Sequence, residues 1–270
     1  MENKLNPELT KEKETLFITL RCKALDSQLK KSLLNDKKAY EILQSLNYDF
    51  NKHKSFDNDI GLVVRAKQMD EWINGYIAKN DNAVIVYLGC GLDTRINRIN
   101  LKNTIKWFDL DFPEVINIRK QFFNEAPNYK MIASSITEFS WLEIIPKKRP
   151  VLIVAEGVLE YIESEKVIEL FNRIVKTFSH GEIIFDVLSL NAVKFGEKDL
   201  SGKTGAQIHW GINNSEEISK YNINLKKISE VILFRSKYMK YLQLKYRMLY
   251  GLITIIPFFK KMIRIMKYEF

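Results

Sequence analysis

The sequence has few of the residues that build disulfide frameworks or metal centres. Its 270 residues include two cysteines, Cys22 and Cys90, and three histidines, and no Cys/His cluster has the spacing of metal ligands. The first residues lack the basic-then-apolar pattern of a secretory signal. The apolar run around 249–259 is interrupted by Pro257 and falls short of the roughly 20 residues that span a bilayer. We therefore expect a cytoplasmic protein with no metal and no stable membrane insertion.

Phosphate-binding glycine motifs are also missing. A dinucleotide fingerprint needs a third glycine where Thr94 stands, and no Gly-Lys-Ser/Thr follows, which excludes a P-loop. What is present is an apolar segment ending in Gly89-Cys-Gly91, followed by a second one ending in two acids, Asp109 and Asp111. This pattern predicts a nucleoside pocket in which one acid accepts the ribose hydroxyls. A pocket with a ribose acid but no phosphate cradle favours S-adenosylmethionine, which carries no phosphate.

Three motifs resemble the leucine carboxyl methyltransferase family, which includes bacterial O-methyltransferases of polyketide-type pathways. They are Leu88–Arg95, Asp109–Ile116 and Ala155–Tyr161. Val63–Asp70 and Arg21–Asp26 fit the same pattern, and the resemblance extends from about residue 15 to residue 189. It implies a class I methyltransferase fold, S-adenosylmethionine as cofactor, and a carboxylate or hydroxyl oxygen as methyl acceptor.

The resemblance also implies cofactor-binding residues. Asp111 corresponds to the ribose ligand, with Asp109 as the rival that could instead cap the next helix. Arg65 corresponds to the residue that binds the methionine carboxylate, which a guanidinium can bind with two hydrogen bonds. Lys23 is a second basic contact, and Glu156 contacts the cofactor at the end of an apolar strand. The remaining implied contacts are Gly89 and Gly91 in the turn and the pair Ser135-Ile136. The family usually has Asp-Leu at this pair, with the aspartate bound to the adenine amino group, and serine replaces that aspartate here.

Periodicity divides the chain into two regions. Residues 8–78 have apolar positions at helical spacing and no strand signal, so we expect residues 1–80 to form a helical cap over the pocket. From Ala83 onward, strands are predicted at 83–88, 105–110, 129–133, 151–155, 182–188, 225–233 and 263–270, with helices between them. This alternation predicts a doubly wound, mostly parallel, seven-stranded Rossmann-like sheet over residues 81–270. The last strand is expected to be antiparallel and at the edge.

The segment 191–221 interrupts the alternation, and segments of this length in compact domains often serve function. We expect it to help form the acceptor pocket, with Tyr161 and His209 as lining candidates. A carboxylate acceptor is already ionised at neutral pH and needs no base. A hydroxyl acceptor would need one, and His209 is the nearest candidate. We therefore favour methylation of a small secondary metabolite at a carboxylate or hydroxyl. Alternatives are a protein C-terminal carboxylate as acceptor, or a non-catalytic relative that binds the cofactor.

The net charge of +9 can reflect coding bias, a nucleic-acid surface or attraction to an anionic partner. No arginine-rich arm or nucleic-acid module is evident, so we expect no nucleic-acid partner and interpret the charge as compositional. The basic, aromatic tail 234–264 is predicted to cover the pocket and lead into the closing strand. The alternative is a membrane-surface segment.

Overall fold

The computed structural model describes residues 4–56, 60–194, 204–242, 244–253, 255–256 and 261–270. Seven strands form a single sheet in the order β3-β2-β1-β4-β5-β7-β6. β1 to β5 run parallel, and β7 is antiparallel to both of its neighbours. The strands are β1 (Val84–Leu88), β2 (Lys106–Asp111), β3 (Tyr129–Ala133), β4 (Val151–Ala155), β5 (Gly181–Leu188), β6 (Lys226–Ile232) and β7 (Ile263–Glu269).

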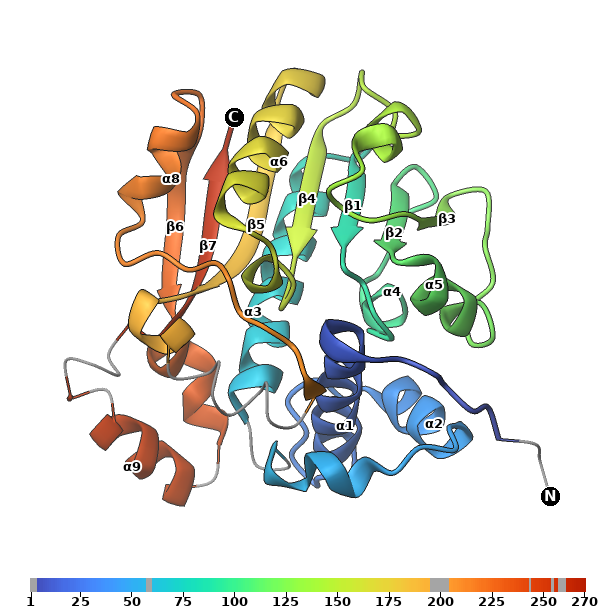
Figure 1. Ribbon diagram of the computed structural model, residues 1–270, viewed down its shortest axis with the longest axis vertical. Coiled ribbons are helices and arrows are strands. Elements are labelled where there is room, and N and C mark those ends of the chain that lie inside the picture. The colour runs from blue at the N-terminus through green and yellow to red at the C-terminus, as the bar shows by residue number, and fades with distance from the viewer. Residues whose placement is uncertain (1–3, 57–59, 195–203, 243, 254, 257–260) are drawn as a thin grey trace.

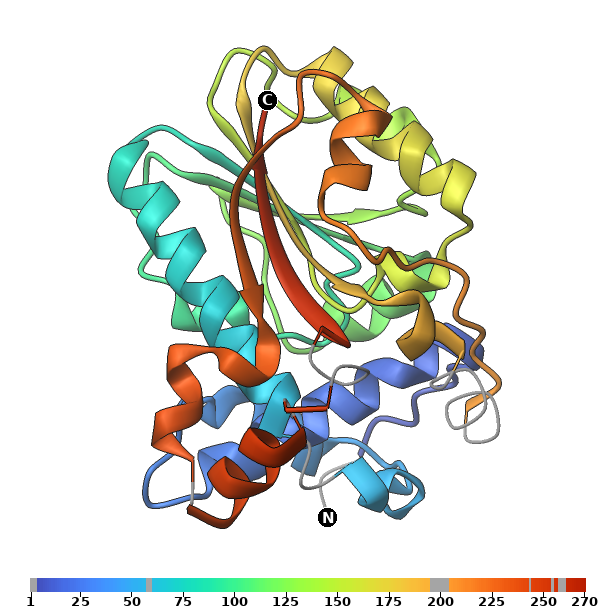
Figure 2. The same ribbon diagram turned by 90° about the vertical axis from the view of Figure 1, so that its left-hand side faces the viewer.

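Helices cover both faces of this sheet (Figure 2). The α-helices are α1 (Leu16–Ser27), α2 (Lys37–Ser45), α3 (Ile60–Lys79), α4 (Arg95–Arg98), α5 (Pro113–Arg119), α6 (Ser164–Thr177), α8 (Glu216–Tyr221) and α9 (Leu244–Ile253). Short 3-10 helices are η1 (Lys11–Thr15), η2 (Phe50–Phe56), η3 (Phe139–Glu143), η4 (Leu159–Tyr161), η5 (Leu233–Arg235) and η6 (Lys237–Tyr241). The doubly wound α/β architecture predicted from the alternating pattern is confirmed.

The central strands are buried on both faces, and their side chains point alternately into two hydrophobic cores, one on each face of the sheet. On β1, Ile85 and Tyr87 belong to the core that also holds Met69 and Ile73 of α3. Val84, Val86 and Leu88 point to the opposite core, which is closed by α6 and η3. The continuous apolar run of β1 is therefore explained by its position in the middle of a covered sheet.

One detail of the sequence-based prediction is wrong. The segment 263–270 was expected at the edge, but β7 lies between β5 and β6, and β6 is the edge strand. Near-alternation of apolar and charged residues suggested an edge, yet Arg264 is fully buried and its guanidinium pairs with Glu230 at 3.5 Å. A buried, paired arginine produces the same sequence pattern as an exposed one.

Of the N-terminal helices, α1 and α2 lie below the sheet, at the end toward which the parallel strands point, and α3 runs along one face of the sheet (Figures 1 and 2). Buried ion pairs join them to the core. Asp36, which caps α2, pairs with Arg98 of α4, and Asp70 of α3 lies 2.6 Å from Arg95 and 2.9 Å from Arg98. Within the described residues, no helix is both long and apolar enough to cross a membrane.

Candidate cofactor and acceptor site

Strand register brings the ends of four parallel strands together. Leu88 pairs with Leu110 and with Ala155, and Asp111 pairs with Ala133. The residues that follow these strands therefore meet at one edge of the sheet, where they line a cavity of about 440 Å³. In parallel sheets with crossover helices, this edge is where ligands bind.

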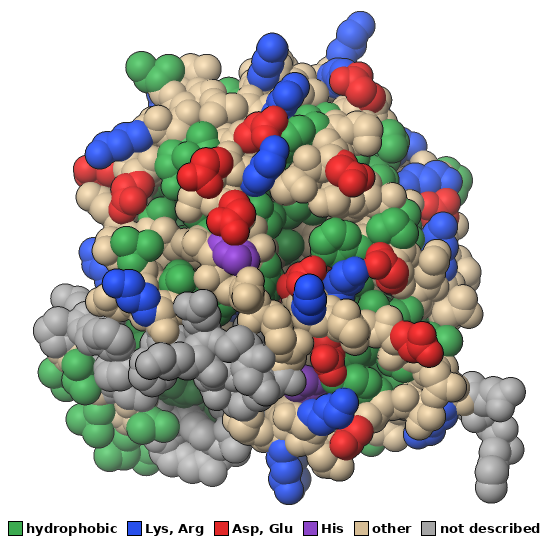
Figure 3. Space-filling view, viewed as in Figure 1, with side chains coloured by type: hydrophobic (Ala, Val, Ile, Leu, Met, Phe, Trp, Pro, Cys, Tyr) green, Lys and Arg blue, Asp and Glu red, His purple; other side chains and the backbone are tan. Residues whose placement is uncertain are grey.

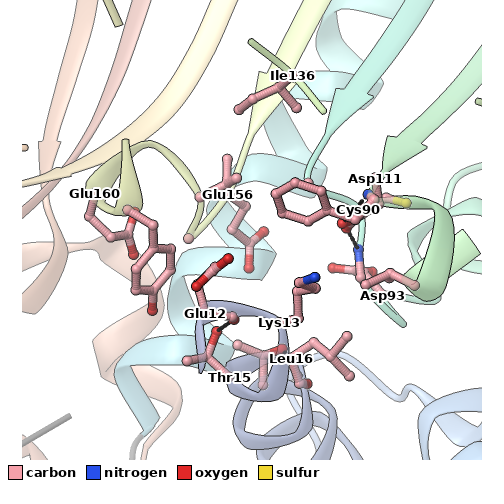
Figure 4. A pocket seen from close by; sticks show the side chains of 18 of the residues that line it. Glu12, Lys13, Thr15, Leu16, Cys90, Asp93, Asp111, Ile136, Glu156 and Glu160 are labelled. Atoms are coloured by element: carbon pink, nitrogen blue, oxygen red, sulfur yellow. Dashed lines mark hydrogen bonds between the residues drawn. The ribbon is translucent and has the colours of Figure 1, made fainter. Parts of the chain in front are cut away.

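The cavity has a wall from the strand ends and a wall from the N-terminal segment. Figure 4 shows Glu156 and Glu160 above a common space, with Glu12, Lys13 and Leu16 below it. Sequence reasoning did not select the η1 residues, because a short polar segment before an amphipathic helix gives no signal of a site. The N-terminal segment therefore contributes to the pocket, as a cap would.

The glycine turn after β1 depends on left-handed backbone. Gly89 has φ +63° and Gly91 has φ +52°, a region that favours glycine. A Cβ at position 89 would lie 2.5 Å from Cγ2 of Val158. The backbone N–H of Gly91 donates to Oδ2 of Asp111 at 2.7 Å, and that of Phe112 donates to Oδ1 at 2.8 Å. The turn and the acid are thus built as one unit.

The two acids of β2 lie in different places. Asp111 lines the cavity, and burial raises its pKa to about 6. Asp109 is fully buried and accepts hydrogen bonds from Trp107 Nε1 at 2.7 Å, Tyr129 Oη at 2.6 Å and Arg119 Nε at 3.0 Å. Its acceptor capacity is used within the core, so only Asp111 is available to a ligand.

Glu156, after β4, lies inside a buried cluster of charges. Its carboxylate is 3.5 Å from Lys23 Nζ and 3.4 Å from Arg65 Nε, and Arg95 donates to its second oxygen. Burial opposes ionisation of Glu156, but Lys23, Arg95 and Arg65 together hold its pKa at about 2. Arg65 also donates from Nη1 to Asp186 Oδ2 at 2.7 Å. The two basic residues expected from the sequence, Lys23 and Arg65, thus meet at Glu156.

Two buried guanidinium nitrogens in this cluster have no hydrogen-bond partner among the described residues, Arg65 Nε and Arg95 Nη1. Arg65 also packs on a glycine, since a Cβ at Gly157 would lie 2.8 Å from its Nη2. Gly157, at φ +64°, donates its N–H to Asp186 Oδ1 at 2.7 Å. Arg65 lines the cavity, so its cationic side chain is the contact that this cluster offers to an anionic ligand group.

Ser135 and Ile136 line the part of the cavity beyond β3. The Ser135 hydroxyl lies 2.9 Å from Oγ1 of Thr137 and accepts a hydrogen bond from the Thr137 N–H at 3.3 Å. Ile136 is buried in the core beside Trp141. Ser135 therefore offers a ligand one polar contact, and Ile136 offers it one apolar contact.

The structure places the two expected acceptor-side residues differently. Tyr161 lines the cavity, whereas His209 does not. His209 lies one step behind the wall: its Nδ1 is 3.0 Å from Oε1 of Glu163, which does line the cavity, and its N–H donates to the Glu160 carbonyl at 2.7 Å. The described part of 191–221 contributes no lining residue to this cavity.

Glu160 is a lining residue that sequence reasoning missed. Burial, with Asp186 nearby, raises its pKa to about 8, so it keeps its proton at neutral pH. The signal was available, since Glu160 lies in the same motif as Glu156, but two acids four residues apart cannot be assigned opposite protonation states without knowledge of their neighbours. Burial also raises the pKa of the Cys90 thiol well above its usual range, which makes it a small residue of the turn rather than a nucleophile. No metal-binding cluster occurs among the residues that the structure describes.

Comparisons with known proteins show which family the chain resembles. The model of the family named leucine carboxyl methyltransferase matches residues 17–175. The tetracenomycin polyketide synthesis O-methyltransferase TcmP of Streptomyces glaucescens is 35% identical over 212 residues, which cover 78% of each chain. The S-adenosyl-L-methionine-dependent methyltransferase dpfgK of Gibberella zeae is 28% identical over 242 residues, or 81% of each chain.

Solved structures share the fold. A crystal structure from Thermobifida fusca YX aligns with TM-score 0.61 at 12% identity, covering 92% of this chain and 93% of that one. The N-methyltransferase NodS of Bradyrhizobium japonicum, in complex with S-adenosyl-L-homocysteine, aligns with TM-score 0.51 at 13% identity, covering 87% and 98%. At these identities, the likeness concerns the class I methyltransferase fold alone.

Proposed function

The chain belongs to the leucine carboxyl methyltransferase family, and we propose that this S-adenosylmethionine-dependent O-methyltransferase methylates a carboxylate of a small molecule. The observation that carries the choice of acceptor is that no histidine is among the described residues that line the cavity. Of the lining acids, Asp111 and Glu156 are assigned to the cofactor, and Glu160 keeps its proton because burial raises its pKa, as burial also does for the Cys90 thiol. A carboxylate acceptor is already ionised and needs no base.

The residues present fit the cofactor. Asp111 is held by two backbone N–H groups, which leaves its remaining lone pairs for two ribose hydroxyls. Gly89 and Gly91 let the backbone approach, Ser135 offers a hydroxyl to the adenine, and Arg65 lines the cavity as a cation for the methionine carboxylate. The bound cofactor supplies the electrophilic methyl group.

The charged cluster prepares the site for methyl transfer. Glu156 stays ionised and so offers negative charge to the cationic part of the cofactor. The protonated carboxyl of Glu160 can donate a hydrogen bond to the acceptor carboxylate and orient it. Because opposite charges are neutralised during the transfer, a preorganised and largely water-free pocket favours it by positioning. The ion pairs of Glu156 fix these side chains before the ligands arrive.

A hydroxyl acceptor is the second candidate, supported by the His209–Glu163 pair behind the cavity wall. Glu163 is the member of this pair that lines the cavity, so it is the base that a hydroxyl acceptor would use. A protein C-terminal carboxylate is less well supported. A Caenorhabditis briggsae protein named probable leucine carboxyl methyltransferase 1 is 24% identical over 202 residues, whereas TcmP, named for polyketide synthesis, is 35% identical.

We further infer that residues 1–80 act as a cap on the core of residues 81–270. Support comes from the η1 and α1 side chains in the cavity wall and from the buried pairs of Asp36 and Asp70 with α4. The acceptor-pocket role of 191–221 remains a proposal. Its support is indirect, because Glu160 accepts backbone hydrogen bonds from His209 and Trp210.

The test is a product analysis with isotopically labelled S-adenosylmethionine and matched acceptors: aromatic carboxylic acids, the corresponding phenols, and a peptide with a free C-terminal leucine. Mild alkali hydrolyses a methyl ester to methanol but leaves a methyl ether intact. We expect alkali-labile label on the small acids. Alkali-stable label on the phenols would establish the hydroxyl acceptor, and label on the peptide alone would establish the protein substrate.

A further inference from the structure

The net positive charge of the chain comes from one segment. Residues 231–268 contain nine Lys and Arg and no Asp or Glu, whereas the rest of the chain has 33 basic and 33 acidic residues. The charge of +9 is therefore carried by the segment that runs from the end of β6 through α9 to β7. A coding bias would spread the excess along the chain, so this distribution needs another explanation.

The same segment exposes most of the large apolar side chains on the described surface. Twelve large hydrophobic residues are exposed in the described chain, and seven of them lie within 241–256. They are Tyr241, Leu244, Met248, Leu249, Leu252, Ile255 and Ile256, with exposed fractions from 47% to 73%. Figure 3 shows hydrophobic side chains gathered at the lower left, over α9. Single exposed apolar residues are ordinary, but a contiguous group marks an interaction site.

Three of these residues lie along one face of α9. Leu244, Met248 and Leu252 follow one another at intervals of four, so they lie along one side of the helix. Tyr250 points elsewhere and stacks on Phe234 of η5 at 4.8 Å between ring centroids, which fastens α9 to the body. The expectation that the tail would cover the pocket is wrong for α9, because none of its described side chains lines the cavity.

Basic side chains flank this face. Arg247 is exposed on α9, and Lys240, just before it, is exposed with its Nζ 5.1 Å from the centroid of the Tyr241 ring. Basic side chains beside exposed aromatic and aliphatic side chains are typical of a protein surface that binds a lipid bilayer. The apolar side chains enter the bilayer there, and the basic groups stay at the level of the lipid headgroups. Lys237 differs, since it pairs with Glu71 at 2.5 Å.

We propose that the exposed side chains in and around α9, which we call the α9 face (Tyr241, Leu244, Met248, Leu249, Leu252, Ile255 and Ile256), bind the surface of an anionic lipid bilayer. Three observations favour this partner. The exposed Leu, Met and Ile side chains match hydrocarbon but have no counterpart on nucleic acid, whose stacking partners are aromatic. A symmetric contact with a second copy would oppose two segments of like charge. No described helix can span a membrane, so the contact is peripheral.

The position of α9 suits this role. α9 lies at the end of the molecule toward which the parallel strands point, beside the N-terminal helices (Figures 1 and 2). The cavity opens at the same end of the sheet, where the strand ends and α1 line it. Binding through the α9 face would hold this end of the enzyme near the bilayer, the phase in which apolar carboxylic acids accumulate.

Co-sedimentation with vesicles tests the proposal. Full-length protein is mixed with phosphatidylcholine vesicles that contain or lack about 30% phosphatidylserine. We expect it to pellet with the anionic vesicles, and about 0.5 M NaCl should reduce the bound fraction because the attraction is partly electrostatic. Met248→Glu/Leu252→Glu and Lys240→Glu/Arg247→Glu should each weaken binding about tenfold or more. Matched controls alter exposed residues elsewhere: Leu29→Glu/Ile223→Glu and Lys120→Glu/Lys176→Glu.

Every outcome bears on the proposal. S-adenosylhomocysteine binding by each variant shows that it has folded. Absence of pelleting with anionic vesicles, or equal losses in the control variants, would overturn the membrane assignment. A dimer in sedimentation velocity that Met248→Glu/Leu252→Glu abolishes would assign the face to a second copy. Binding to a duplex oligonucleotide that survives Met248→Glu/Leu252→Glu but not Lys240→Glu/Arg247→Glu would assign it to nucleic acid.

Discussion

The backbone N–H of Gly91 donates a hydrogen bond of 2.7 Å to Oδ2 of Asp111, which joins the turn after β1 to the last residue of β2. This single contact fixes the carboxylate that faces the cavity and explains why the glycine turn and the acid occur together in the sequence. Asp109, two residues earlier on the same strand, is fully buried and accepts its hydrogen bonds within the core.

Asp111→Ala should weaken S-adenosylhomocysteine binding by roughly 1.5–3 kcal/mol, the scale of hydrogen bonds to a charged group. Asp109→Ala should instead destabilise the fold by roughly 3–5 kcal/mol, because it leaves the buried Arg119 without its acid. Calorimetric titration and thermal unfolding of both variants separate the effects. If Asp109→Ala lost more cofactor affinity than Asp111→Ala while remaining folded, the assignment of the ribose acid would be reversed.

Cofactor binding should weaken as the pH falls through about 6, the pKa to which burial raises Asp111. Below this pH the carboxyl is protonated and loses acceptor capacity for the ribose hydroxyls, so affinity is greatest above it. Asp111→Asn, which cannot titrate, is the control and should bind weakly with no such decline. Isothermal titration across this range checks the prediction, and a flat profile for the wild type would contradict it.

Arg65→Ala should weaken cofactor binding by roughly 1.5–3 kcal/mol. It also leaves Asp186 without its partner at 2.7 Å, so loss of stability could be mistaken for loss of affinity. The double variant Arg65→Met/Asp186→Asn removes the unpaired charge and isolates the effect on binding. Unchanged affinity in a folded double variant would show that Arg65 serves only the ion-pair network.

The stability of the protein should fall with rising pH because of Glu160. Its pKa is about 8 in the folded protein against an ordinary 4.5, so the folded state holds the proton more tightly. Its contribution is complete below about pH 4.5 and is lost as the pH rises through about 8. Between these two pH values, the free energy of unfolding of Glu160→Gln should therefore rise relative to that of the wild type by an amount on the order of 2–4 kcal/mol. Thermal unfolding at several pH values measures it, with the exposed Glu163→Gln as control; parallel curves for wild type and Glu160→Gln would disprove the raised pKa.

The strands and the cofactor side of the site followed from the sequence because they rest on local rules. Apolar runs that end in Gly89, Asp111 and Glu156 predict strand ends, and parallel strands bring those ends together. The neighbours of Glu156 could not be predicted in the same way. Lys23 and Arg95 reach it from α1 and α4, across 133 and 61 residues of sequence. Such partners depend on tertiary packing, which no local pattern records.

The sequence left the role of the α9 face open between a cover for the pocket and a membrane-surface segment, for a different reason. A stripe at intervals of four predicts an apolar helix face but not whether protein covers it, so Leu244, Met248 and Leu252 could equally have lain in a core. The wrong prediction of the position of β7 has a similar origin, because the sequence does not distinguish a buried arginine that has an acidic partner, such as Arg264, from an exposed one.

Because β7 lies between β5 and β6, the pairing of β6 with the sheet depends on β7. In the described sheet β6 pairs with β7 alone, although it comes earlier in the chain, so β6 has no place in the sheet until the segment after it has docked on β5. Deletion of residues 263–269 would remove one strand and release another, exposing the unpaired backbone of β5 as a template for aggregation. During synthesis the cofactor half of the sheet can be complete while this edge is still open, and the last docking step closes it.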